Sequence, residues 1–331
     1  MKKTLFRAAR LGHASVMALA LMAAGGAAAQ GSYPSKPVNI YTPFAVGSGP
    51  DAVLRQVADR LSKMWKQPVI INNKPGAGGF LAFESTQRAA PDGYTLLQLD
   101  SEHLAAVPYL YKSRNFQTLD VYEPVATLFR TPFLISVPTD SSLKSVKDLV
   151  AAAKAAPGRM SYGSWGIGSP GHLGGEALEL ATGTTMQHVP YREVSQLYGS
   201  VASNDVQWAF ASIPSSQGVF KAGKIRYIAV AAPKRIPQMP NVPTVAESGG
   251  PADLDVNSFV VLVSPKGMPA DLKTKINADV QKVLADPEIK ERFNTFAFEV
   301  LNWTPEEIRR NADAKARIYS NLIQRKNLTL E

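Results

Sequence analysis

Cysteine is absent from the chain of 331 residues. Its absence excludes disulfide bonds, thiolate nucleophiles, thiolate-held iron–sulfur clusters and zinc sites built on cysteine. Histidine is scarce as well. The three that lie beyond the N-terminal region, His103, His172 and His188, are far apart and lack the spacings of zinc ligands. We therefore expect no metal site.

Long apolar runs are also lacking, apart from one short stretch near the N-terminus. Residues 1–29 have the composition of a cleavable export signal, with a basic start, an apolar stretch at 14–23 and three alanines at 27–29. That stretch is shorter than the roughly 20 residues of a permanent bilayer span. We expect cleavage after residue 29 and a soluble periplasmic protein; an uncleaved N-terminal anchor is the alternative.

Charge of one sign does not dominate the chain. The formal net charge is +9, and it falls to +5 once the four basic residues of the signal are removed. A modest charge scattered along the chain does not indicate a nucleic-acid partner and instead favours a small organic anion.

What the sequence does contain is a regular alternation of strand-like and helix-like segments. Short apolar strands separated by amphipathic helices predict parallel βαβ units and an α/β fold. The strands are expected at 38–42, 68–72, 95–99, 124–128, 133–138, 160–163, 206–211, 226–232 and 259–264. The helices are expected at 51–66, 80–90, 145–156, 171–182, 193–203, 269–284, 287–294 and 305–325.

The length and the order of these segments predict two lobes, because the mature chain exceeds one typical domain. The apolar strands near 133–138 and 259–264 are expected to cross between the lobes. Lobe 1 would contain residues 30–132 and 259–331, and lobe 2 residues 133–258. A two-lobed protein of this kind binds its ligand in the cleft between the lobes.

Three glycine-rich loops, 43–51, 73–80 and 163–172, each connect an expected strand to an expected helix. Backbone N–H groups in the first turn of a helix lack internal partners, and the helix dipole favours an anion there. The loops therefore predict a site for a carboxylate; the simpler alternative is that the glycines only form tight turns.

Residues 166–171 match the dinucleotide pattern G-x-G-x-x-G, but they lie in mid-chain rather than after a first strand. We expect no nicotinamide or other cofactor. No serine here fits the nucleophile pattern G-x-S-x-G. An exported serine hydrolase that uses Ser169 and His172 remains the enzyme alternative.

At these loops the chain resembles the Bug-type (TctC-like) periplasmic solute-binding proteins of the tripartite tricarboxylate transporters. The resemblance covers nearly the whole mature chain and rests on residues 33–38, 43–51, 73–79, 90–96, 161–173, 189–191, 223–226 and 241–249. It implies the two-lobed type II periplasmic-binding-protein fold, with a mixed, mostly parallel sheet in each lobe. It also implies a monomer without catalytic activity or cofactor that transiently contacts an inner-membrane permease.

The resemblance also implies which residues bind the ligand. In lobe 1 these are Phe44, Val46, Gly47, Ser48, Asp51, Gly79, Asp100 and Ser101. In lobe 2 they are Ser164, Trp165, Gly168, Ser169, Tyr191, Arg192 and Ser212.

The chain departs from the family pattern at Trp165 and at Arg192-Glu193. Arg192 would pair with a second carboxylate, and Trp165 or Phe44 would stack on a ring. The hypothesis is a di- or tricarboxylate ligand, and an aromatic dicarboxylate in particular. The alternative places Arg192 in a salt bridge with Glu193 or another surface acid and Trp165 in the core.

Overall fold

The computed structural model describes residues 33–330 of the chain. The predicted export signal, residues 1–29, lies outside the described residues. Within the described residues, each helix is too short or too polar to cross a bilayer.

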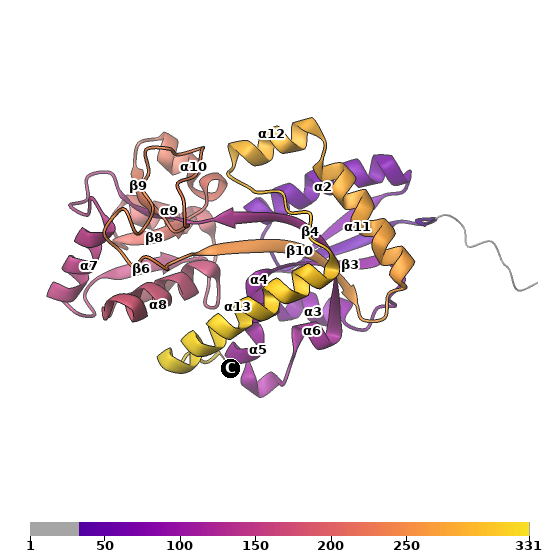
Figure 1. The fold of residues 1–331 in the computed structure, drawn as a ribbon, viewed down its shortest axis with the longest axis horizontal. Helices are drawn as coiled ribbons and strands as arrows, with labels where there is room; N and C mark the ends of the chain where they lie inside the picture. The colour runs from indigo at the N-terminus through magenta and orange to yellow at the C-terminus, as the bar shows by residue number, and fades with distance from the viewer. Residues whose placement is uncertain (1–32, 331) are drawn as a thin grey trace, which may run out of the picture. The chain divides into compact units, whose positions relative to one another are not determined.

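The first sheet has five strands in the order β2-β1-β3-β10-β4, of which β3, β10 and β4 are labelled in Figure 1. Strand β1 is parallel to β2 and β3, whereas β10 is antiparallel to both of its neighbours, β3 and β4. The bounds are β1 Val38–Thr42, β2 Val69–Asn73, β3 Thr95–Asp100, β4 Tyr122–Pro132 and β10 Asn257–Pro265. The sheet is therefore mixed, as predicted: four of its five strands run in one direction and β10 runs against them, which gives two parallel and two antiparallel pairings.

The second sheet repeats this pattern with the order β7-β6-β8-β5-β9. Strand β6 is parallel to β7 and β8, and β5 is antiparallel to β8 and β9. The bounds are β5 Leu134–Pro138, β6 Ser161–Ser164, β7 Gln187–Pro190, β8 Trp208–Ala211 and β9 Ile225–Val230. Edge strand β7 was not predicted, because QHVP is short and half polar.

The α-helices are α2 Gly49–Trp65, α3 Phe80–Thr86, α4 Ser101–Ala105, α5 Val107–Leu110, α6 Thr118–Val121, α7 Val146–Ala155, α8 Pro170–Thr182, α9 Val194–Ala202, α10 Ile213–Lys221, α11 Ala270–Leu284, α12 Pro287–Thr295 and α13 Pro305–Lys326. Helix α13 begins as predicted, at a capping box between Thr304 and Glu307 with proline at its start. Helix α10 and the short helices α4, α5 and α6 were not predicted. The expected helix 80–90 ends at Thr86.

The core gathers on both faces of the central strands. In β10, every residue after Asn257 is buried, as expected for a strand with neighbours on both sides and helices over both faces. The chain leaves the first sheet at the end of β4 and enters the second at β5, with only Phe133 between them. Phe133 is hydrogen-bonded to Val256, where the chain returns. The boundaries of the two lobes remain a prediction.

Candidate ligand-binding site

A cavity of about 310 Å³ lies where strands of the first sheet face helices that follow strands of the second. Its walls come from the end of β3, from β4 and β10, and from the starts of α2, α8, α9 and α10. The lining residues are Phe44, Gly47, Ser48, Gly49, Pro50, Asp100, Phe129, Thr131, Phe133, Trp165, Pro170, Val194, Ser195, Tyr198, Ser212, Pro214, Ser215, Ser258, Val260 and Phe298.

The register of three adjacent strands builds one wall. Val260 of β10 lies opposite Asp100 of β3 and opposite Phe129 of β4. Ser258 lies opposite Thr131. Because alternate residues of a strand share a face, Ser258 and Val260 point to the same side.

Helix N-termini build the facing walls. Ser48 caps α2 by accepting from the backbone N–H of Asp51, and Ser212 forms a capping box with Ser215 at α10. Helix α9 begins without a side-chain cap hydrogen bond. Its first residues, Val194 and Ser195, line the cavity. Because they are in the first turn of the helix, their backbone N–H groups have no intrahelical partner. The helix dipoles place partial positive charge on this side.

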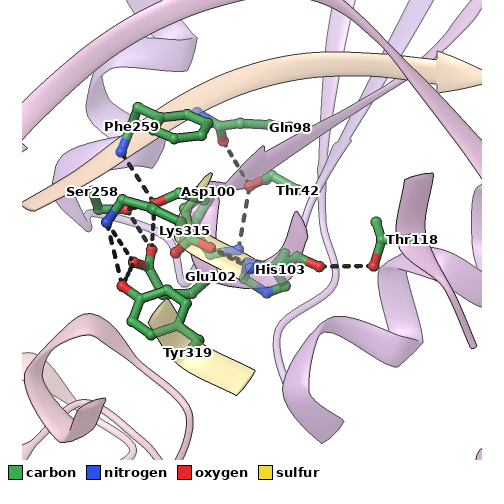
Figure 2. A network of polar contacts seen from close by, with 12 residues as sticks. Thr42, Gln98, Asp100, Glu102, His103, Thr118, Ser258, Phe259, Lys315 and Tyr319 are labelled. Atoms are coloured by element: carbon green, nitrogen blue, oxygen red, sulfur yellow. Dashed lines mark hydrogen bonds and ion pairs between the residues drawn. The ribbon is translucent and has the colours of Figure 1, made fainter. Parts of the chain in front are cut away.

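Asp100 is the only ionisable acid or base among the lining residues apart from the Tyr198 phenol; no lysine, arginine or histidine is included. Its Oδ1 accepts from the backbone N–H of His103 at 2.9 Å and lies 2.5 Å from the Nδ1 of the same residue (Figure 2). Burial opposes ionisation of Asp100, but the charge and hydrogen bonds of His103 outweigh it and lower its pKa. Burial likewise opposes the cation of His103, yet Asp100 raises its pKa.

A second acid lies just behind the wall. Glu102 is buried and accepts from the hydroxyls of Ser258 at 2.6 Å and Tyr319 at 2.6 Å (Figure 2). The ammonium group of Lys315 lies 3.5 Å from Glu102 and donates to the backbone oxygen of Asn257 at 2.6 Å. This network holds Ser258 in place and commits its hydroxyl hydrogen to Glu102.

Aromatic rings form the apolar part of the cavity. Phe133 and Trp165 lie with ring centroids 5.2 Å apart, and Phe129 and Phe298 are stacked at 4.3 Å. Phe44 meets the ring of His103 edge-on at 5.7 Å. Trp165 both packs against core residues and lines the cavity. The two expectations for this residue, core packing and ligand contact, are therefore compatible.

Of the predicted ligand-binding residues, six lie together in the cavity wall: Phe44, Gly47, Ser48, Asp100, Trp165 and Ser212. They come from both groups of predicted residues. Their contact with a ligand stays a prediction.

The other residues predicted for lobe 1 lie outside the wall. Val46 is 71% exposed, whereas Asp51 is buried and paired with Arg55 at 3.0 Å. Gly79 packs against the ring of His103, and buried Ser101 donates to Glu102 at 3.0 Å. Loop 73–80 therefore lies behind the first loop, rather than in the wall.

The other residues predicted for lobe 2 also lie outside the wall. Buried Ser164 meets Nε2 of His188 at 2.7 Å, and Gly168 donates its backbone N–H to Nδ1 of His172. Tyr191 packs on the core beside β6. Arg192 is exposed, and none of the ion pairs among residues 33–330 joins it to Glu193 or to another acid. The expected partner for a second carboxylate is thus not in the wall.

The geometry at Ser169 does not form the hydrolase dyad. Its hydroxyl donates to the backbone oxygen of Gly166 at 2.7 Å and accepts from the backbone N–H of His172. The His172 ring accepts from Gly168 through Nδ1 and turns Nε2 toward Glu176 at 3.5 Å. Both ring nitrogens therefore face groups other than the Ser169 hydroxyl.

Sequence reasoning missed most of the strand wall and the start of α9. The missed residues include Phe129, Thr131, Phe133, Val194, Ser195, Tyr198, Pro214, Ser215, Ser258, Val260 and Phe298. The start of α9 carried a usable signal, because a helix was expected from 193. The strand residues carried none, since the register between β4 and β10 joins segments more than 100 residues apart.

Comparisons with known proteins agree with this architecture. Residues 53–328 match the family model described as the tripartite tricarboxylate transporter family receptor, TctC. A UPF0065 protein in the gbd 5′ region of Cupriavidus necator is 33% identical over 292 residues, which are 88% of each chain.

Two solved structures are similar in fold and sequence. The periplasmic binding protein BugD superposes with a TM-score of 0.80 at 28% identity, over 90% of this chain and all of BugD. The R. palustris protein Rpa4515, solved with adipate, has a TM-score of 0.81 at 27% identity, over 88% of this chain and 97% of that one. With its two five-stranded sheets and matched family model, the chain belongs to the TctC family of periplasmic solute receptors of tripartite tricarboxylate transporters.

Proposed function

We propose that this receptor, after export and removal of residues 1–29, captures a carboxylate-bearing small molecule in the 310 Å³ cavity and delivers it unchanged to an inner-membrane permease. The lobes would be residues 30–132 with 259–331, and residues 133–258. They would rotate about the segments near 133 and 257 to enclose the ligand.

One observation carries the proposal: helix N-termini from both halves of the molecule open onto one cavity that holds no basic side chain. Gly49 of α2 approaches it from one side, and Val194 and Ser195 of α9 from the other. Unpaired backbone N–H groups and aligned dipoles bind a carboxylate without an arginine or lysine. We place the ligand carboxylate between the N-termini of α2 and α9, where the hydroxyl of Ser195 donates a hydrogen bond to it.

The aromatic walls favour an apolar or aromatic body for the ligand. Rings at Phe44, Phe133 and Trp165 offer faces and edges for stacking. The adipate found with Rpa4515 supports a carboxylate with an apolar middle. Adipate carries a carboxylate at each end, which also supports the di- or tricarboxylate first expected, but Arg192, the residue expected to pair with the second carboxylate, is outside the wall.

Calorimetric titration of the ligand-stripped protein with mono-, di- and tricarboxylates tests the proposal. At least one is expected to bind and to be recovered chemically unchanged. Ser195→Asp puts a negative charge at the start of α9 and should weaken binding at least tenfold, since like charges brought together cost several kcal/mol. The same change should stabilise the unliganded protein by about 0.3–1 kcal/mol through the helix dipole.

Ser203→Asp is the matched control, because it adds the same charge at the far end of α9, away from the cavity. It should leave affinity within about twofold of wild type. Equal loss of affinity in both variants, or binding of neutral solutes only, would reject the proposal.

A further inference from the structure

The cavity offers hydrogen-bond donors at the N-termini of α2 and α9. It offers acceptors on the wall formed by β3, β4 and β10, which we call the strand wall. Building on the proposed function, we propose that the ligand carries an N–H donor, such as an ammonium or amino group, in addition to its carboxylate. Asp100 is the specificity-determining residue that accepts this hydrogen bond.

The hydrogen bonds of Asp100 leave one carboxylate oxygen open. Both contacts with His103, from the backbone N–H at 2.9 Å and from Nδ1 at 2.5 Å, go to Oδ1. Oδ2 accepts no hydrogen bond that the structure records among residues 33–330. The Asp100 side chain is only 9% exposed and lines the cavity, so the solvent that reaches Oδ2 is the solvent a ligand displaces.

The neighbours of Asp100 on the same wall are also acceptors. The hydroxyl of Ser258 donates its hydrogen to Glu102, and that of Thr131 donates to the backbone oxygen of Pro132 at 3.2 Å. A hydroxyl has one hydrogen to donate, so with these hydrogens committed Ser258 and Thr131 offer a ligand acceptors and no side-chain donor. The polar groups of the strand wall therefore accept hydrogen bonds, whereas the N-termini of α2 and α9 donate them.

Because the lining includes no basic side chain, this difference between the two walls decides which ligands the cavity selects. When the cavity closes, a ligand without a donor leaves the Asp100 oxygen without water and without a partner, which is a large penalty for a charged group. A ligand with a second carboxylate at this end would add repulsion. A ligand with an N–H group replaces the lost water and pairs with the charge.

Matched pairs of ligands test the inference on the wild-type protein. Calorimetry would compare benzoate with 3- and 4-aminobenzoate, glutarate with glutamate, and butyrate with 4-aminobutyrate. In a pair that binds, the amino member should bind at least tenfold more tightly, because a site with a buried acceptor rejects the analogue that lacks the donor.

Asp100→Asn replaces the open acceptor by an amide of the same shape. It should weaken binding of the amino members at least tenfold and that of their partners by less than threefold, which removes the preference. Asp253→Asn is the control, because it makes the same chemical change at an exposed site outside the cavity lining and should preserve the preference. If Asp100→Asn does not fold, since Asp100 also caps α4, the wild-type pairs decide alone.

The two proposals fail differently. If both members of each binding pair have equal affinity, and Ser195→Asp still weakens them, the role of Asp100 is overturned and the carboxylate receptor stands. If no carboxylate of either series binds, both proposals are overturned.

Discussion

At the scale of single residues, Gly79 lies outside the cavity but determines the position of His103, which holds Asp100 in the cavity wall. Its backbone has a φ of +92°, a conformation that side-chain-bearing residues rarely adopt. A Cβ there would lie 2.5 Å from Cδ2 of His103, the partner of Asp100. Phe44 and Phe83 hold the same ring edge-on from other directions. Gly79, predicted as a ligand contact, therefore sets the place of His103.

Gly79→Ala is expected to lower the free energy of unfolding by about 2–4 kcal/mol, the sum of left-handed strain and overpacking. Displacement of His103 should also weaken ligand binding. Urea denaturation and calorimetry measure both effects. The matched control is Gly199→Ala in α9, where nothing lies within 4 Å of the new methyl group. It should be neutral or stabilise by up to about 1 kcal/mol; equal behaviour of the two variants would contradict the assignment.

At the scale of elements, α8 and β7 share a buried cluster of titratable groups. The ring of His188 in β7 lies against that of His172 in α8, with centroids 4.1 Å apart and planes tilted by 31°, and its Nε2 meets the hydroxyl of Ser164. Burial and the neighbouring His172 lower the pKa of His188 to about 3. Burial opposes ionisation of Glu176, but hydrogen bonds and charges from His172 and Lys326 outweigh it and lower its pKa to about 2.

The lowered pKa of His188 predicts a loss of stability in weak acid. The unfolded chain takes up a proton near pH 6.5, whereas the folded chain resists it down to about pH 3. The contribution of neutral His188 is therefore complete above pH 6.5 and is lost as the pH falls toward 3. Urea denaturation should show it decline by about 1–2 kcal/mol between pH 7 and 4.5, with allowance for partial exposure.

The comparison with His188→Gln isolates this contribution. The difference in unfolding free energy between wild type and variant should shrink across this range. His103 acts in the opposite direction, because its raised pKa favours the folded state at lower pH, but it is common to both proteins. A difference that is independent of pH would contradict the assignment.

At the scale of the whole described chain, α13 packs against α4, which follows a strand of the first sheet, and against α8, which follows a strand of the second. Figure 1 shows α13 running past α4 toward α8. Leu322 and Ile323 of α13 share a core cluster with Leu173 of α8. At the end of α13, the ammonium group of Lys326 pairs with Glu176 at 2.9 Å and with Glu179.

Lys326→Ala should destabilise the protein by about 2–4 kcal/mol, because two largely buried carboxylates lose their common cation. Chemical denaturation measures the loss. Adding Glu176→Gln and Glu179→Gln should restore part of it, since neutral amides need no cation. Lys282→Ala, an exposed lysine on α11, serves as the control and should change stability by less than about 0.5 kcal/mol. No rescue by the amides would show that the charge on Lys326 is unimportant.

Secondary structure was predictable where local signals agree. The start of α13 was found because Thr304, Pro305 and Glu307 are all local signals of a helix start. Helix α10 was missed because IPSSQGVFK contains proline, glycine and two serines, and it forms under tertiary packing against β9. The short helix α4 depends on the Asp100 cap, which no periodicity reveals.

The candidate site was predictable only in part. Loops 43–51 and 163–172 contribute to the wall through residues such as Ser48 and Trp165, and their role in ligand binding stays a prediction. Loop 73–80 is also glycine-rich but contributes no residue to the wall, and the side-chain amide of Asn73 donates to the backbone oxygen of Phe44 in loop 43–51. Composition predicts that a loop can bind an anion, but it does not predict which way the loop faces.

By itself, the sequence determined the order of the main strands and helices, the family and the helix starts that favour an anion, because all of these depend on residues close together in the chain. Only the tertiary structure decided which of the predicted residues, Asp100 among them, stand in the cavity wall and that this wall includes no basic side chain. The pairing of β3, β10 and β4 brings these residues together across more than 100 positions, and that pairing follows from packing of the whole core.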